Sequence, residues 1–133
     1  MSVKEYINKN KSRFLDELFE LLKIPSVSAD QKFKKEVDKA AEYLVNQFNN
    51  LDLDNVEKIK TDGHPIVYAE KILKDSIPTI LVYGHYDVQP ADPYELWETP
   101  PFEPNIRNNK IYARGACDDK GQMYMHLKAC ETL

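Results

Sequence analysis

Apolar residues recur at helical spacing in two segments near the start of the chain. Ser2 followed by Glu5 has the spacing of a capping box, and the apolar positions after it keep a helical period until Pro25. A second amphipathic segment starts near Ser28 and ends near Asn50. We expect two helices that pack an apolar face inward and leave a charged face in solvent.

The pattern changes to short β-rich segments after Asn55. Strands are predicted over 56–60, 66–72 and 79–83, and the last of these, Thr-Ile-Leu-Val-Tyr, is almost wholly apolar. A strand of this composition is expected to be buried on both faces, as in sheets that helices cover on both sides. The pattern therefore predicts an α/β fold, a mixed sheet flanked by helices.

The last third of the chain begins with a long loop. Residues 88–104 hold five of the eight prolines, and 105–113 resemble a hairpin whose turn, Asn108-Asn109, suits positive φ. From about Lys120 to the last residue the pattern is helical, with Met123, Leu127 and Cys130 on one face. Because the pattern stops without a capping signal, we expect residues 1–133 to be the truncated amino-terminal segment of a larger domain.

Composition narrows the classes of protein. The 133 residues suit one soluble domain, and 18 basic against 22 acidic side chains give a net charge of −4 without a long run of one sign. No segment approaches the roughly 20 apolar residues of a membrane span. Cys117 and Cys130 lack the spacing of a thiolate metal site and indicate reduced thiols. We therefore expect a cytoplasmic protein without nucleic-acid or membrane partners.

His85 and Asp87 directly follow the apolar segment 79–83. Ligand sites of open α/β sheets collect beyond the carboxyl ends of strands, and residues i and i+2 of an extended segment point the same way. One side chain can then bind a metal while the other orients the imidazole ring. Taken alone the pattern is weak, because a lone histidine is more often a surface or core residue.

Asp118 and Asp119 follow the small-residue turn Gly115-Ala116 and precede the predicted last helix. A carboxylate at the start of a helix is also favoured by capping and by the helix dipole, so one of the two can be purely structural. Together with His85 and Asp87, however, the pair offers ligands suited to zinc or a similar divalent ion.

Several separated motifs resemble one known family. These are residues 82–92, with Tyr-Gly-His-Tyr-Asp-Val-Gln-Pro at their centre, Trp97, Pro100-Pro101-Phe102, residues 112–121, and Ile-Pro-Ser-Val-Ser at 24–28. In this order they resemble the zinc aminoacylase and carboxypeptidase family of two-zinc metallopeptidases, and in form they are most similar to its carnosinase-like dipeptidase branch. The resemblance covers essentially the whole chain and implies an incomplete zinc-peptidase catalytic domain.

The resemblance also implies roles for the acidic residues and the histidine. His85 would bind one zinc ion, Asp87 would be the catalytic carboxylate that supports its imidazole, and Asp118 would bridge two zinc ions. Asp119 would be the neighbouring structural carboxylate, joined to Asp118 by a cis peptide bond. Manganese or cobalt could replace zinc. The family's general base and remaining ligands lie downstream of the Asp-Lys-Gly motif, and Glu131 is too close to that motif to be the base.

Three functions remain open at this point. The resemblance implies a metal-dependent enzyme that hydrolyses the amide bond of dipeptides or short peptides. The 133 residues alone are expected to bind metal weakly and to be inactive, because one histidine and one bridging carboxylate fall short of the three or four protein ligands of a zinc ion. Deacylation of N-acyl amino acids is the alternative within the same chemistry. A catalytically dead binding or assembly module is the alternative of another class. In a truncated domain, exposed sheet edges would promote self-association.

Other candidate residues are interpreted as structural. We expect His64 to be a turn residue, His126 a surface or packing residue of the last helix, and Cys117 a packing residue. Lys120 is expected to neutralise nearby carboxylates rather than act as a base.

Overall fold

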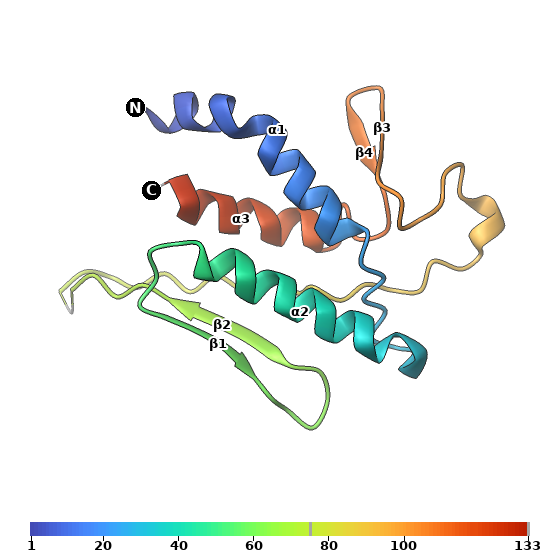
Figure 1. Cartoon of the computed structure of the whole chain (residues 1–133), viewed down its shortest axis with the longest axis horizontal. Helices are drawn as coiled ribbons and strands as arrows, with labels where there is room; N and C mark the ends of the chain where they lie inside the picture. The colour runs from blue at the N-terminus through green and yellow to red at the C-terminus, as the bar shows by residue number, and fades with distance from the viewer. Residues whose placement is uncertain (75, 133) are drawn as a thin grey trace.

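The computed structural model describes residues 1–74 and 76–132, which form helices and small antiparallel sheets (Figure 1). The helices are α1 (Val3–Leu22), α2 (Lys34–Asn49) and α3 (Lys120–Thr132), with short 3₁₀ turns at Gln31–Phe33 and Tyr94–Leu96. The strands are β1 (Asn55–Ile59), β2 (Ile66–Glu70), β3 (Asn105–Arg107) and β4 (Lys110–Tyr112). The combination confirms the predicted α/β class.

The two amino-terminal helices begin at capping residues. Ser2 and Glu5 form the predicted capping box, in which Glu5 N–H donates to Ser2 Oγ at 3.3 Å and Ser2 N–H donates to Glu5 Oε2 at 2.7 Å. The second helical segment starts at a 3₁₀ turn that Asp30 caps by accepting from Lys32 N–H at 3.0 Å. It therefore begins slightly later than predicted, because Asp30 rather than Ser28 satisfies the first free N–H groups.

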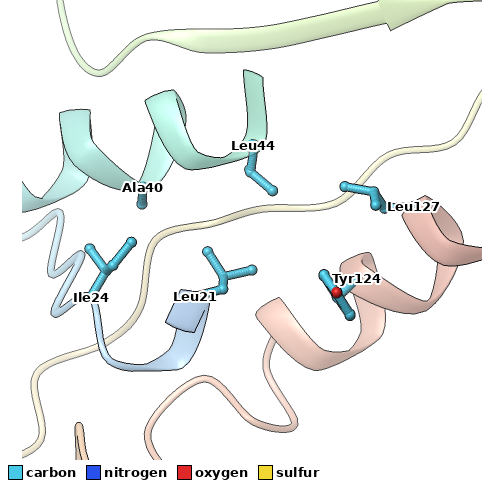
Figure 2. Packing of buried hydrophobic residues seen from close by; sticks show 6 residues of the cluster. All are labelled: Leu21, Ile24, Ala40, Leu44, Tyr124 and Leu127. Atoms are coloured by element: carbon cyan, nitrogen blue, oxygen red, sulfur yellow. The ribbon is translucent and has the colours of Figure 1, made fainter. Parts of the chain in front are cut away.

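The core lies where the three helices meet (Figure 2). Its buried members come from the end of α1, the inner face of α2 and the middle of α3, and point toward one another: Leu21, Ile24, Ala40, Leu44, Tyr124 and Leu127. An extended segment of the chain passes between them, and Tyr86 of that segment packs against the cluster. The core therefore holds the segment that carries His85 and Asp87.

The predicted hairpin over 105–113 is present, and the first two predicted strands form a second hairpin. Strands β1 and β2 pair antiparallel and pack on α2, and β3 pairs with β4 at the opposite end of the chain's fold (Figure 1). Asn108 and Asn109 have φ values of 50° and 60°, as their residue type predicted. Among the described residues, the strand pairs are antiparallel, and an isolated parallel bridge joins Val27 to Val88.

The expectation of a buried strand over 79–83 is wrong. In the structure this segment belongs to no strand, and the exposed fractions of Ile80 and Leu81 are 86% and 89%. Apolar composition alone cannot bury a strand, since its backbone groups need neighbouring strands to pair with. No strand of the described residues pairs with it: β1 pairs with β2, and β3 pairs with β4.

The inner face of α3 also differs from the prediction. Leu127 is buried as expected, but Cys130 is exposed, and Tyr124 and Lys128 are buried instead. The hydroxyl of Tyr124 donates to Glu17 at 2.7 Å, and Lys128 Nζ lies 2.5 Å from the same carboxylate. The apolar stems of both side chains can therefore pack in the core while their polar ends are satisfied by α1.

The lengths and compositions of the helices bear on whether one could span a membrane. None in the described part of the chain is long and apolar enough to cross a bilayer.

Candidate metal centre

The segment 84–88 is held along one side by residues that follow α1. Val88 N–H donates to Ser26 O at 3.0 Å, and the Ser26 hydroxyl donates to Tyr86 O at 2.6 Å. The bridge between Val27 and Val88 aligns the two segments in parallel. Because Ser26 and Val27 are buried, the backbone around His85 is fixed by a dry surface rather than by solvent-exposed contacts.

The turn that carries Asp118 depends on close backbone packing at two glycines. Gly115 has φ +83°, and a Cβ there would lie 2.7 Å from Val88 Cγ1. A Cβ on Gly121 would lie 2.1 Å from the carbonyl oxygen of Ala116. The Asp118–Asp119 peptide bond is cis, which confirms the prediction made from the resemblance.

Lys120 ties the start of α3 to the end of α1. It is fully buried, and its Nζ donates to Leu21 O at 3.0 Å and to Ile24 O at 2.6 Å. Burial lowers the pKa of Lys120 to about 7, with the charge of Asp87 acting in the opposite direction. The expectation that Lys120 neutralises local carboxylates is wrong, because its Nζ is held by the carbonyls of Leu21 and Ile24. These two carbonyls also accept from backbone N–H groups at the end of α1 and just after it.

The structure brings His85, Asp87 and Asp118 together. His85 Nδ1 lies 3.1 Å from both the carbonyl oxygen and Oδ1 of Asp87, and Nε2 lies 3.0 Å from Asp118 Oδ1. Since the carbonyl and the carboxylate at Nδ1 are acceptors, Nδ1 carries the proton on that side. Nε2 is then the nitrogen directed at Asp118 and available to a metal.

The pKa of His85 reflects opposing effects. Burial lowers it, while the hydrogen bond to the Asp87 backbone, the hydrogen bond to Asp118 and the charges of Asp87 and Asp119 raise it, and the net shift is upward. The upward shift of this pKa means that a proton between His85 and Asp118 is held to a higher pH than on a free imidazole. A cation bound there would replace that proton.

Asp119 faces the protein rather than the site. Its Oδ2 accepts from the backbone N–H of His85 at 3.0 Å, whereas the Asp118 side chain is 80% exposed. The two neighbouring carboxylates thus differ in what they can do: Asp119 positions the backbone of His85, and Asp118 is free to bind a ligand. The roles that the resemblance implies, metal bridging for Asp118 and a structural role for Asp119, stay predictions.

The donors fit a divalent metal site in part. An imidazole nitrogen and a carboxylate oxygen are suitable ligands for zinc, and both face the same space. Across residues 1–74 and 76–132, no group of three or more His, Cys, Asp or Glu side chains is arranged to hold a metal. His85 and Asp118 therefore supply two of the three or four protein ligands that zinc commonly needs.

The candidate centre lies at one end of a groove of about 660 Å³. The groove runs between α2, β2, the extended segment 79–87 and α3, and apolar side chains form most of its lining. His85 and Asp87 are among the lining residues. A metal at His85 would thus be reached from an open apolar channel.

The remaining candidates lie away from the His85–Asp118 contact. His64 is a turn residue, as predicted, and its Nε2 donates to Ser28 O at 3.2 Å. His126 is exposed on α3, and both cysteines are free. Cys117 is exposed, so the expected packing role is wrong: its side chain leaves the turn toward solvent.

Comparison with known proteins finds a matching family. Residues 81–133 match the family described as Peptidase family M20/M25/M40. The matched residues include His85, Asp87 and the Asp118-Asp119 pair, and the predicted resemblance to this family of metallopeptidases is confirmed.

The particular relatives are peptidases of related kinds. The chain is 34% identical to Cys-Gly metallodipeptidase dug1 of Schizosaccharomyces pombe over 96% of its own length and 29% of that protein. It is similar in structure to human carnosine dipeptidase 1, with a TM-score of 0.89 and 27% identity, covering 98% of this chain and 30% of that one. It is also similar to the M20 family metallo-carboxypeptidase Sso-CP2 from Sulfolobus solfataricus, with a TM-score of 0.80 and 43% identity, covering 89% of this chain and 26% of that one. The chain thus spans under a third of each.

Proposed function

We propose that this chain contributes part of the metal centre of a dipeptidase. The observation that carries the proposal is the position of the His85 imidazole, with Nδ1 fixed by Asp87 and Nε2 facing Asp118 at 3.0 Å. His85 and Asp118 would hold the metal, which we propose to be zinc, with manganese or cobalt as substitutes. The remaining ligands and the general base are not supplied by these residues.

The residues of the chain prepare the site for an ion. Asp87 accepts from His85 Nδ1, which keeps Nε2 as the ligand nitrogen and raises its basicity. Asp119 holds the backbone of His85, so the ring and the Asp118 carboxylate converge before any ion binds. When bound, zinc would lower the pKa of a coordinated water and polarise the scissile carbonyl.

The substrate class is proposed from the relatives. Two of the similar proteins are named as dipeptidases, which supports a dipeptide or short peptide as substrate. The similarity to a metallo-carboxypeptidase favours a second candidate, the removal of a carboxyl-terminal residue from a longer or amino-blocked substrate. Deacylation of N-acyl amino acids hydrolyses the same kind of amide bond by the same chemistry, and it stays an alternative.

Zinc titration of the purified chain tests the metal site. We expect weak binding that His85→Ala and Asp118→Ala both abolish, whereas His126→Ala, which removes an exposed histidine on α3, leaves it unchanged. Calorimetry at several pH values should also show proton release where His85 is protonated, because an imidazole must lose its proton to bind a metal. Zinc binding that survives both site substitutions would contradict the proposal and favour a binding or assembly module.

A chimera tests the substrate class. The chain would replace the matching segment of the S. pombe metallodipeptidase, and the chimera would be assayed with Cys-Gly, its N-acetylated form and an N-acetyl amino acid. Hydrolysis of the free dipeptide alone supports a dipeptidase, and hydrolysis of the blocked dipeptide supports a carboxypeptidase. Loss of Cys-Gly hydrolysis in the His85→Ala chimera is the required control. Fractionation of the native cells would test the proposed cytoplasmic location.

A further inference from the structure

The Asp87 carboxylate is held on both of its oxygens. Oδ1 lies 3.1 Å from His85 Nδ1, and Oδ2 accepts a hydrogen bond from the Ser28 hydroxyl. Ser28 lies 59 positions away in the chain, at the end of the segment that follows α1. We propose that Ser28 is a positioning residue that orients Asp87 toward His85, an inference that rests on the proposed metal-binding role of His85.

A carboxylate in this position needs a second contact to stay aligned. The terminal torsion of aspartate is broad and roughly two-fold, so one hydrogen bond leaves the plane of the group free to turn. The Asp87 side chain is 39% exposed, and water therefore competes for its oxygens. The Ser28 hydroxyl removes this freedom because it occupies the oxygen that His85 does not use.

The backbone places the Ser28 hydroxyl before it meets Asp87. The neighbouring Val27 is buried and bridged to Val88, and the Ser28 carbonyl accepts from His64 Nε2 at 3.2 Å. Contacts on both sides thus fix Ser28 relative to the segment that carries Asp87. A hydroxyl fixed in this way loses little freedom on bonding, so it can act as an orienting group rather than an incidental partner.

The pair of substitutions Ser28→Thr and Ser28→Val isolates the hydroxyl. Threonine and valine have nearly the same shape, and only threonine can donate to Asp87. In the metal-free protein, nitrogen NMR follows the His85 Nδ1–H signal and its exchange with water. With Zn²⁺ alone as the probe, the same spectra give the dissociation constant. Ser28→Ala serves as the second hydroxyl-free variant if Ser28→Val does not fold.

We expect Ser28→Thr to resemble the unmodified chain and Ser28→Val to bind zinc about three- to tenfold more weakly, a smaller loss than the 10–100-fold typical when the supporting carboxylate itself is replaced. Exchange of the His85 Nδ1–H proton with water should be faster in Ser28→Val. In an Asp87→Ala background Ser28→Val should have no further effect on either quantity, because Ser28 acts through Asp87.

The outcomes separate this inference from the proposed function. If zinc binds through His85 and the threonine and valine variants agree in both measurements, the role of Ser28 is overturned. If the unmodified chain shows no His85-dependent zinc binding, the proposed function fails, and the exchange rate of Nδ1–H still decides whether Ser28 orients Asp87. An effect of Ser28→Val that persists in the Asp87→Ala background also overturns the inference.

Discussion

The extended run from 79 to 91 consists of two parts whose apolar residues differ in burial. Before Gly84, Ile80 and Leu81 are 86% and 89% exposed, whereas after it Val88 and Ala91 are 3% and 1% exposed. The second part lies against the segment that follows α1 and against Gly115, and the first part has no strand of the described residues beside it. Burial here follows from available partners rather than from hydrophobicity.

Replacement of Lys120, which ties α3 to the end of α1, should give the largest loss of stability. Lys120→Met retains a similar stem but removes the Lys120 donor from Leu21 O and Ile24 O, which then keep only their backbone partners, and this should lower the free energy of unfolding by about 3 kcal/mol. Urea denaturation measures this change. The matched control is Lys110→Met on the exposed β4 strand, which should change stability by less than about 0.5 kcal/mol. Equal effects of the two substitutions would contradict a tie between α3 and α1.

Gly84, at the boundary between the two parts, has little room for a side chain. A Cβ on Gly84 would lie 2.7 Å from Met123 Cγ and 3.0 Å from Asp119 Oδ2, so Gly84→Ala should destabilise the protein by about 2 kcal/mol. Gly63→Ala is the control, because a Cβ there has only Thr61 Oγ1 at 3.8 Å. Thermal unfolding of both variants should show a lower transition temperature for Gly84→Ala alone.

Truncation of matched apolar residues compares the two parts directly. Val88→Ala should destabilise the chain by about 1.5 kcal/mol, because Val88 is buried against Gly115. Leu81→Ala removes more atoms but should change stability by less than about 0.5 kcal/mol. If Leu81→Ala proves the more damaging of the two, the segment 79–83 is packed in solution.

The contact between α1 and α3 should contribute less stability in acid. Burial raises the pKa of Glu131, but hydrogen bonds from Arg13, Lys128 and Tyr6 outweigh it and lower the pKa to about 2. The stability that Glu131 contributes, about 1 kcal/mol, is complete above its ordinary pKa of 4.5 and is lost as the pH falls toward 2. Glu131→Gln should reduce this slope in unfolding free energy between pH 6 and about 3. Parallel profiles would assign the acid sensitivity to another group.

The smallest effect on stability, and the largest on association, is expected for the exposed part. Self-association through this segment stays a prediction, supported by its run of exposed apolar side chains. Leu81→Lys should leave the unfolding transition in place and reduce the apparent mass in light scattering. A strictly monomeric unmodified chain would remove the basis for the prediction.

Local signals in the sequence predicted most of the elements. The capping box at Ser2 and Glu5 and the turn at Asn108-Asn109 are set by residues within a few positions of each other, and both are present. The burial of 79–83 and the inner face of α3 depended on distant partners. Glu17 on α1 decides the orientation of Lys128, and no periodicity within α3 contains that information.

The site shows the same division between features set by nearby residues and features set by distant ones. The spacing of His85 and Asp87 predicted that they meet, and the resemblance added Asp118 and the cis bond. Ser28 was missed as a partner of Asp87, and Lys120 was given the wrong partners, because both contacts join residues far apart in the chain. The resemblance of Ile-Pro-Ser-Val-Ser at 24–28 to the same family was the one signal that pointed to this segment.

The short segment 24–28 works as a spacer of fixed length between the two ligands. The carbonyl of its first residue, Ile24, accepts from Lys120 Nζ, and the hydroxyl of its last residue, Ser28, donates to Asp87. These five residues therefore set the separation of Asp118 from His85. Inserting or deleting one residue within 24–28 would therefore displace His85 and Asp118 relative to each other. Lengthening the β3–β4 turn at Asn108-Asn109 would leave the separation unchanged, although that turn lies between the ligands in sequence.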